Sequence, residues 1–306
     1  MTEYKEEGIV VRGLGGAFTV RTDAGAYYTC RAKGVLKRND GKLLVGDRVT
    51  LSRSEDGQEC VVSEILARRC ALIRPPLANV TVLLLVMAGA YPAPSLPTAD
   101  RLLAICAHEG IEPVIVLTKS DLAKAENEAL CALYRDAGYE VYSTCATTGA
   151  GTDALRAALS EKLRAGGIAA FAGASGVGKS TLLCALFPSL ALETGALSEK
   201  TARGRHTTRH VELFDFSGGF VADTPGFSLL DFEHFDFFSL DDLFDAFPDF
   251  APYRGACRYD DCTHVKEEGC ALLDAVREGR VAPSRHETYA ELYAILKTKK
   301  STYPKR

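Results

Sequence analysis

The stretch GASGVGKST at residues 173–181 constrains the fold more than any other part of the chain. It matches the pattern G-x-x-x-x-G-K-[ST], in which glycines let successive backbone N–H groups point at phosphates. The helix that follows such a loop adds its positive N-terminal end. An apolar run, IAAFA, precedes the stretch and a helical run follows it. The segment therefore predicts a phosphate-binding loop between a strand and a helix.

Two shorter motifs occur in an unusual order around this loop. TKSD at 118–121 has the form of a base-reading motif but precedes the loop, and DTPG at 223–226 follows it. Each motif ends an apolar run, and parallel α/β sheets bind ligands at the carboxyl ends of their strands. Because the ends of a domain often lie close together, its sequence can be permuted without altering the site. The order predicts a circularly permuted GTPase domain; the alternative for TKSD alone is a solvated turn.

The chemistry of nucleotide binding assigns a role to each motif. The Asp121 carboxylate can accept two hydrogen bonds from guanine, a donor pair that adenine lacks. Lys179 can reach the β- and γ-phosphates, and Ser180 is a candidate ligand of Mg²⁺, with Asp223 near the metal. The predicted GTP-binding residues of these motifs are Thr118, Lys119, Ser120, Asp121, Gly173, Ala174, Ser175, Gly176, Val177, Gly178, Lys179, Ser180, Thr181, Asp223 and Gly226.

Thr118 stands at a position where base-reading motifs usually have Asn. A hydroxyl group can replace only part of what an amide does. We therefore expect the base-reading loop to be held less firmly by this side chain than in a usual GTPase.

Residues 1–67 contain five short alternating runs that Gly and Asp-Gly turns separate. This pattern favours a five-stranded barrel of the OB type. Such barrels often bind oligonucleotides; the alternative is a barrel that only packs on its neighbour. The net charge of −4 argues against a uniformly basic surface but allows local basic patches. Residues 68–76 and 297–306 are two such stretches, unless they are ordinary solvated surface.

Three cysteines and one histidine form the pattern C-x₄-C-x-H-x₅-C near the C-terminus: Cys257, Cys262, His264 and Cys270. Three thiolates and one imidazole suit a closed, structural, tetrahedral zinc site; the alternative is a cluster of free thiols. The segment from 230 onward has few apolar runs, so we expect it to need the metal to fold. The other seven cysteines, which lie on apolar segments, are predicted to fill cores.

Composition and pattern together indicate a cytoplasmic multidomain protein. Ten cysteines without a secretory signal favour a reducing compartment, and the longest apolar runs are too short to span a membrane. The strand–helix alternation of the middle region predicts a largely parallel sheet covered by helices. The predicted domains are an OB-fold barrel (1–67), a circularly permuted α/β P-loop GTPase domain (68–229) and a small zinc-binding α domain (230–306).

The motifs as a set resemble the RsgA (YjeQ) family of small-subunit-dependent GTPases. The resemblance rests on RPPLANV (74–80), LTKSDL (117–122), GASGVGKSTL (173–182), TGALSEKTARGRHTTRHVEL (194–213), DTPGF (223–227) and CRYDDCTHVKEEGC (257–270). It implies a protein with a small zinc domain, holding one zinc ion, that binds the small ribosomal subunit and its rRNA late in maturation. There it would hydrolyse GTP to GDP with Mg²⁺. We expect the protein to be a monomer.

The segment RGRHTTRH (203–210) lies where a GTPase has its first switch. Thr207 and Thr208 are the candidates for the hydroxyl that joins Mg²⁺ when the γ-phosphate is present, and the sequence does not decide between them. The resemblance points to His206 as the residue that orients water, since Phe227 stands where many GTPases have Gln; the alternative is that His206 contacts RNA or packs. The resemblance also places Cys145 and Ala146 in a second base-contacting loop.

Two other classes of protein are compatible with a phosphate-binding loop. A P-loop kinase would need an acceptor pocket and a lid, and the sequence has a signature of neither. A nucleotide-gated binding module with little turnover overlaps with the GTPase interpretation, because slow hydrolysis stimulated by a partner is normal for switches.

Overall fold

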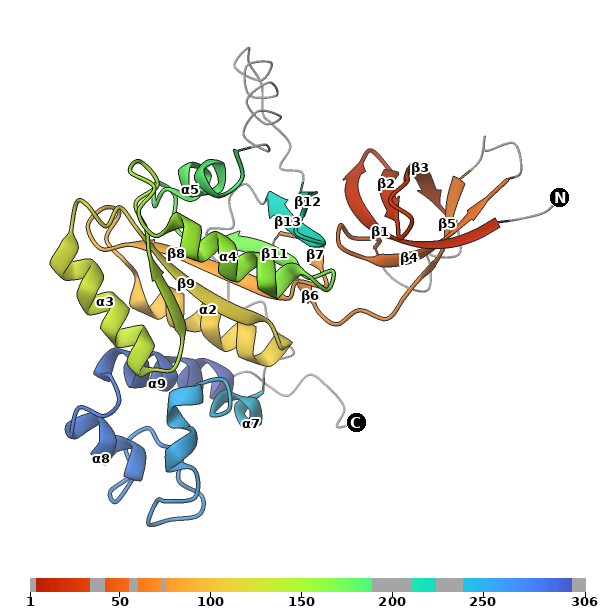
Figure 1. The fold of residues 1–306 in the computed structure, drawn as a ribbon. Coiled ribbons are helices and arrows are strands. Elements are labelled where there is room, and N and C mark those ends of the chain that lie inside the picture. Colours follow the sequence, from red (N-terminus) through yellow and green to blue (C-terminus); the bar gives the residue numbers. More distant parts are fainter. Residues whose placement is uncertain are drawn as a thin grey trace. The chain divides into compact units, whose positions relative to one another are not determined.

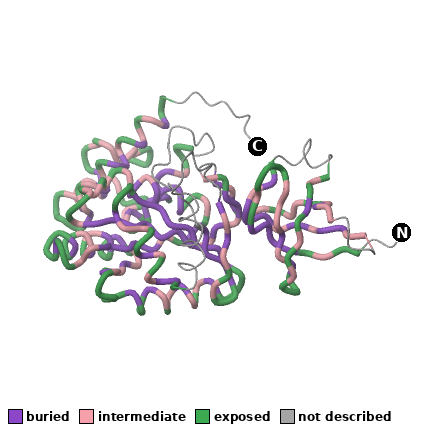
Figure 2. Tube along the Cα trace, turned by 90° about the horizontal axis from the view of Figure 1, so that it is seen from above, coloured by how far each residue is buried: buried purple, intermediate pink, exposed green. Residues whose placement is uncertain are grey.

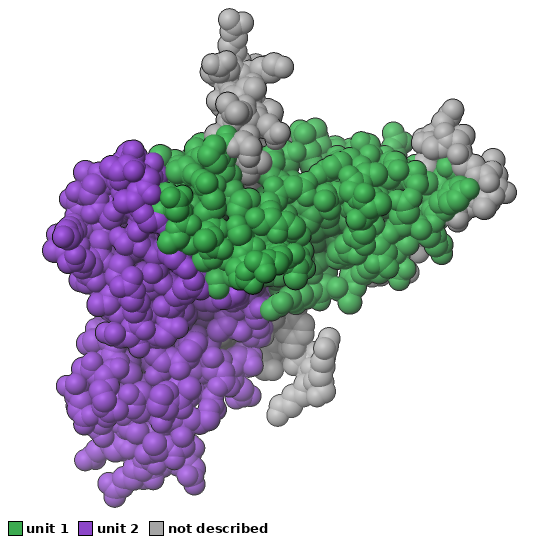
Figure 3. Space-filling model, in the orientation of Figure 1, with its two compact units in different colours: residues 1–84, 152–172, 179–227 green, residues 85–151, 173–178, 228–306 purple. Residues whose placement is uncertain are grey.

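The structure, a computed structural model, describes residues 4–33, 42–54, 60–72, 75–188, 211–223 and 239–298. The chain forms two compact units, each built from separate stretches of sequence (Figures 1 and 3). The first unit comprises residues 1–84, 152–172 and 179–227, and the second comprises residues 85–151, 173–178 and 228–306. Among the helices within the described ranges, none combines the length and the apolar character that crossing a membrane requires.

The N-terminal part of the first unit is a closed five-stranded barrel, as predicted. Its strands are β1 (Tyr4–Leu14), β2 (Ala17–Thr22), β3 (Tyr27–Ala32), β4 (Arg48–Arg53) and β5 (Cys60–Ile65). They pair in the order β1-β2-β3-β5-β4, and β4 closes the barrel by pairing with β1. Side chains alternate between the two faces of a strand, so positions such as Val49 and Leu51 share the buried interior. Figure 2 shows how buried, intermediate and exposed residues are distributed along the described parts of the chain.

The rest of the first unit contains a short pairing of β6 (Ala71–Leu72) with β7 (Leu77–Ala78) and five further elements. These are α4 (Thr152–Leu163), β11 (Ile168–Ala172), α5 (Lys179–Leu186), β12 (Glu212–Phe216) and β13 (Gly219–Asp223). β11 and β13 are parallel, whereas β12 and β13 form an antiparallel hairpin. The sheet is thus mixed here: Ser217 and Gly218 both have positive φ, which makes the tight two-residue turn of a hairpin.

The second unit begins within β8 (Val82–Ala88) and continues through α2 (Leu96–Glu109), β9 (Glu112–Thr118), α3 (Lys124–Asp136) and β10 (Glu140–Ser143). The strands lie in the order β10-β9-β8, and β9 and β10 are parallel. β9 is buried from Val114 to Thr118, which fits a strand that helices cover. Because β9 and β10 are parallel, Thr118 and Ser143 lie at the same edge of the sheet.

The C-terminal part of the second unit contains α7 (Leu240–Leu243), the 3₁₀ helix η2 (Pro248–Tyr253), α8 (Ala271–Arg277) and α9 (Pro283–Thr298). Its apolar core is larger than the sequence suggested, with Phe247, Phe250 and Leu292 fully buried. This core also includes Ala104 and Ile105 of α2, so helical packing supports the segment as well as any metal.

A buried ion cluster connects α9 to α2. Arg285 has no exposed surface, and its guanidinium lies 2.9 Å from Asp100 of α2 and 2.7 Å from Asp249 of η2. The same guanidinium donates to the Tyr139 hydroxyl at 3.1 Å. Loss of one partner would leave a buried, uncompensated charge, so these contacts hold α9 against α2 and η2.

Candidate functional site

The loop from Gly173 to Gly178 leaves β11 directly and ends where α5 begins, which is the strand and helix context that its sequence predicted. Gly173 has φ +150, and a Cβ built there would lie 2.2 Å from the Val86 carbonyl oxygen. Gly178 has φ +97, a conformation that residues with a side chain rarely adopt. Glycine is therefore required at both positions, and it lets the backbone curl as a phosphate-binding loop does.

TKSD contacts the phosphate-binding loop directly, although 59 residues separate Thr118 from Val177. The Thr118 hydroxyl lies 2.5 Å from the Val177 carbonyl oxygen. The Lys119 amine donates to the Gly176 carbonyl at 2.8 Å and to the Tyr91 carbonyl at 2.7 Å. The two motifs that occur in inverted order in the sequence thus meet in one site within the second unit.

The loop after β10 lies beside TKSD and includes Cys145 and Ala146. The Ser120 N–H donates to the Thr144 carbonyl at 3.2 Å, which connects the two loops. The Cys145 thiol donates to Asp121 Oδ1 at 3.2 Å and lies 3.0 Å from the Thr147 hydroxyl. Hydrogen bonds with Thr147 and Thr148 lower the pKa of this thiol. Asp121 is exposed, so its carboxylate is held on one side and open to a ligand on the other.

The residues predicted to contact phosphate and metal follow Gly178 and belong to the first unit. Lys179, Ser180 and Thr181 form the first turn of α5, where the positive end of the helix dipole lies. Lys179 is half-buried, and this burial lowers the pKa of its amine. Asp223 ends β13. The side chain of Asp223 and the predicted residues His206, Thr207, Thr208 and Gly226 lie outside the described residues.

The four predicted zinc ligands converge at one point of the second unit. His264 Nδ1 lies 3.4 Å from Cys257 Sγ, 3.5 Å from Cys270 Sγ and 3.8 Å from Cys262 Sγ. All four donor atoms lie within 4.8 Å of one another. A tetrahedron with Zn–S bonds of about 2.3 Å and a Zn–N bond of about 2.0 Å has edges of roughly 3.5–3.8 Å. The donor set and its spacing therefore fit a zinc ion.

Three residues that the sequence pattern did not identify hold this Cys₃His cluster in shape. The Glu267 carboxylate accepts from the backbone N–H groups of Thr263, Val265 and Lys266 at 3.0–3.3 Å. The His286 Nε2–H donates to the His264 carbonyl at 2.8 Å, and the Tyr289 hydroxyl donates to the Thr263 carbonyl at 3.0 Å. Hydrogen bonds of this kind help to orient metal ligands.

The other seven cysteines match the prediction in part. Cys30, Cys70, Cys106, Cys131 and Cys145 are buried, and Cys60 is half-buried. The prediction is wrong for Cys184, which is exposed on α5, because its apolar neighbours along the chain face the interior and Cys184 does not.

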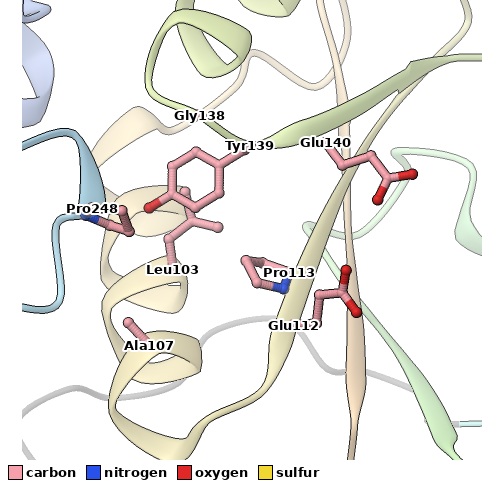
Figure 4. A pocket seen from close by; sticks show the side chains of 8 residues that line it. All are labelled: Leu103, Ala107, Glu112, Pro113, Gly138, Tyr139, Glu140 and Pro248. Atoms are coloured by element: carbon pink, nitrogen blue, oxygen red, sulfur yellow. The ribbon is translucent and has the colours of Figure 1, made fainter. Parts of the chain in front are cut away.

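A cavity of about 310 Å³ opens in the second unit, away from the motifs (Figure 4). Glu112 begins β9 and Glu140 begins β10, so the cavity lies at the edge of the sheet opposite Thr118 and Ser143. It is therefore separate from the candidate nucleotide site. Its lining residues are Leu103, Ala107, Glu112, Pro113, Gly138, Tyr139, Glu140 and Pro248.

Comparisons with known proteins agree with this geometry. A family model described as RsgA GTPase matches residues 65–233, and one described as RsgA N-terminal domain matches residues 7–62. Two relatives named small ribosomal subunit biogenesis GTPase RsgA are similar over nearly the full chain. The Moorella thermoacetica protein is 43% identical over 94% of this chain and 96% of its own length. The Geobacillus thermodenitrificans protein is 40% identical over 97% of this chain and 99% of its own length.

Two solved structures are similar to the whole fold. YjeQ from Thermotoga maritima matches with a TM-score of 0.78 and 29% identity, over 97% of this chain and 100% of that one. YloQ, described as a circularly permuted GTPase, matches with a TM-score of 0.75 and 32% identity, over 98% of each chain.

Proposed function

This chain belongs to the RsgA GTPase family, and on that premise we propose that it binds the small ribosomal subunit and hydrolyses GTP there during late subunit maturation. The fold is that of a circularly permuted GTPase with an N-terminal barrel. The observation that carries the proposal is the contact of Thr118 and Lys119 with Val177 and Gly176. It joins a base-reading motif to a phosphate-binding loop despite their inverted order.

Each group of residues has a proposed part in binding and hydrolysis. Asp121 pairs with the guanine edge, the Lys119 stem covers the base plane, and the loop of Cys145 and Ala146 closes the base pocket. The backbone of residues 173–178 and the amine of Lys179 hold the phosphates, as in other P-loop proteins. Ser180, with Asp223 and one of the two switch threonines, would hold the Mg²⁺ that arrives with GTP. His206 would then orient the attacking water.

The remaining assignments follow from the same proposal. The chain acts as a monomer in the cytoplasm, where ribosomal subunits mature. Its domains are the barrel at 1–67, the GTPase domain at 68–229 and the zinc domain at 230–306, close to the bounds of the two matching family models. Local basic faces, among them Arg203, Arg205 and Arg209, would contact rRNA, since the chain as a whole has a net charge of −4.

Hydrolysis of GTP, measured with and without purified small ribosomal subunits, tests the proposed function. We expect a slow intrinsic rate and strong stimulation by the subunit, because partners commonly complete the catalytic sites of GTPases. Large ribosomal subunits at equal concentration are the control. An equal rate in all three conditions would contradict the proposed partner, whereas hydrolysis of ATP in place of GTP would contradict the GTPase assignment.

Binding to the subunit is expected to depend on both nucleotide and salt. It should be tighter with a non-hydrolysable GTP analogue than with GDP, since switch segments commonly couple nucleotide to partner affinity. It should weaken as salt rises, because contacts with RNA phosphates release counterions. Co-sedimentation with small subunits measures both effects; affinity that responds to neither contradicts an rRNA contact.

Joint replacement of Arg203 and Arg205 by Gln locates that contact. Subunit-stimulated turnover should fall more than the intrinsic rate, because the arginines would act on the partner. Joint replacement of Lys124 and Arg135 on α3 by Gln removes the same charge elsewhere and is the matched control. Equal losses in the two double variants would mean that net charge, and not the switch segment, determines binding.

Replacement of Cys262 by Ser is expected to remove about one zinc ion per chain, because a closed site needs all four ligands. Residues 239–298 should then become more sensitive to proteolysis, while the distant phosphate-binding loop still binds GDP. The exposed Cys184, replaced by Ser, is the control for loss of a thiol. The zinc content of the wild type and of both variants is measured by metal analysis. Wild-type protein without zinc, or a Cys262→Ser variant that retains zinc, would contradict the proposed zinc site.

A further inference from the structure

The Thr118 hydroxyl has one hydrogen but lies within hydrogen-bonding distance of two carbonyl oxygens of other residues. Its Oγ1 lies 2.5 Å from the Val177 carbonyl oxygen and 3.1 Å from the Met87 carbonyl oxygen, and the side chain is buried. A hydroxyl can donate to one of these oxygens at a time, whereas the NH₂ group of Asn could donate to both. Thr118 therefore ties the base-reading loop to the phosphate-binding loop or to the end of β8, but not to both at once.

Asn127 supplies an amide at the same place from a different element. It lies in the first turns of α3 and is only 2% exposed. Its Oδ1 accepts from the Gly89 N–H, just past the end of β8, at 3.1 Å. Its Nδ2 donates to the Lys119 carbonyl at 3.4 Å, which is a long hydrogen bond. The side chain thus bridges β8 and the base-reading loop.

Lys119 needs such support because its backbone conformation is unfavourable. Its φ is +55, in the left-handed region that long side chains rarely adopt. Such conformations persist only where the surroundings determine them. The Lys119 amine is held by Gly176 and Tyr91, and its carbonyl oxygen accepts from Asn127 and from the Leu122 N–H at 3.0 Å. The Lys119 peptide in turn sets the direction in which the chain presents Asp121, two residues later.

Asn127 has little freedom to move away from this position. A Cβ built on Gly89 would lie 2.9 Å from the Asn127 backbone nitrogen and 3.0 Å from Asn127 Oδ1, so the chain just past β8 approaches α3 closely. The Asn127 backbone N–H donates to the Ala123 carbonyl at 3.0 Å. The close approach of Gly89 and the helical hydrogen bond therefore hold Asn127 Oδ1 beside the Gly89 N–H, and from there Nδ2 reaches the Lys119 carbonyl.

We infer that Asn127 is a positioning residue of the base site, which supplies the amide that Thr118 lacks and so fixes the base-reading loop for guanine. The inference rests on the proposed function, since it assumes that Asp121 reads guanine. It also explains how a loop that begins with Thr in place of Asn can be held firmly: the amide comes from α3, nine residues further along the chain.

Replacement of Asn127 by Ala is the first test. We expect the affinity for GDP to fall about 10-fold, because the Gly89 N–H loses its acceptor and the Lys119 carbonyl loses one donor. The affinity for ADP, which Asp121 does not read, should change less, so the GDP/ADP ratio falls. The kcat at saturating GTP should stay within about 2-fold of wild type while KM rises, because the loop contacts the base and not the reacting phosphate.

Rescue distinguishes positioning from general stability. Adding Thr118→Asn to Asn127→Ala restores an amide at the loop, so it should recover most of the lost GDP affinity. Cys131→Ala is the matched control, since Cys131 is a buried residue one turn further along α3. It should lower the Tm of the nucleotide-free protein comparably and leave the GDP/ADP ratio unchanged. If Asn127→Ala does not fold, the isosteric Asn127→Asp, which places an acceptor against the Lys119 carbonyl, should give the same loss.

The outcomes separate this inference from the proposed function. A GDP/ADP ratio that is unchanged in both Asn127 variants, or a double variant that gains nothing from Thr118→Asn, overturns the inference while the wild-type protein still prefers GDP. A wild-type protein that binds GDP and ADP alike overturns the proposed function, and the inference with it.

Discussion

Replacement of Asp121 by Asn is expected to lower the affinity for GDP by about 10²–10³-fold, because two charge-assisted hydrogen bonds to the guanine edge are lost. The same variant should bind xanthosine diphosphate better than wild type does, since xanthine presents an acceptor where guanine presents a donor. The structure supports this role: Asp121 is exposed, and the Cys145 thiol holds one of its oxygens at 3.2 Å. Competition binding with GDP, ADP and xanthosine diphosphate measures the change.

The control for this switch of specificity is Asp136→Asn, which removes the same charge from the exposed end of α3. It should leave all three affinities unchanged. The assignment is contradicted if Asp121→Asn weakens GDP and xanthosine diphosphate equally, since the carboxylate would then support the loop without reading the base. Wild-type protein that already binds ADP as well as GDP contradicts it more directly.

The parts of the fold that follow local rules could be predicted from the sequence. The alternation of apolar and polar residues, as at Val49 and Leu51, predicted the strands of the barrel. The continuous apolar run of β9 indicated a buried parallel strand. The glycines of residues 173–178 are required by positive φ and by the close approach of Val86, which their spacing already implied. The antiparallel hairpin of β12 and β13 depends on the conformation of Ser217 and Gly218, which the pattern of apolar runs does not reveal.

The contacts that could not be predicted connect residues far apart in the sequence. Nothing in the sequence distinguishes Asn127 from other polar residues of a helix, and only the structure shows that its amide forms hydrogen bonds with Gly89 and Lys119. Arg285 pairs with Asp100, 185 residues away, and neither residue belongs to a recognisable motif. The sequence does not distinguish Glu267 from an ordinary surface carboxylate, and only the structure shows that it accepts hydrogen bonds from the loop of the Cys₃His cluster. Motifs therefore identified the candidate ligand-binding groups, but not the residues that hold those groups in position.

Replacement of His206 by Ala is expected to slow GTP hydrolysis by about 10²-fold while GTP binding stays nearly intact. Phe227, the residue after DTPG, has an apolar ring that cannot orient water. The resemblance to the RsgA family points to His206 as the residue that does so. Single-turnover hydrolysis, measured with and without small subunits, gives the effect, and binding of a non-hydrolysable analogue shows that the nucleotide site is intact. His210→Ala, in the same segment, is the matched control.

The two rates distinguish the possible roles of His206. If it orients water, the intrinsic and the subunit-stimulated rates should both fall. If it contacts RNA instead, the intrinsic rate should remain and only the stimulation should fall, together with the affinity for the subunit. Unchanged rates under both conditions would exclude both roles. Arg203, Arg205 and Arg209 flank His206 in the sequence, so their contact with the subunit would also position His206. Stimulation of hydrolysis by the subunit would then result from the placement of this one catalytic side chain.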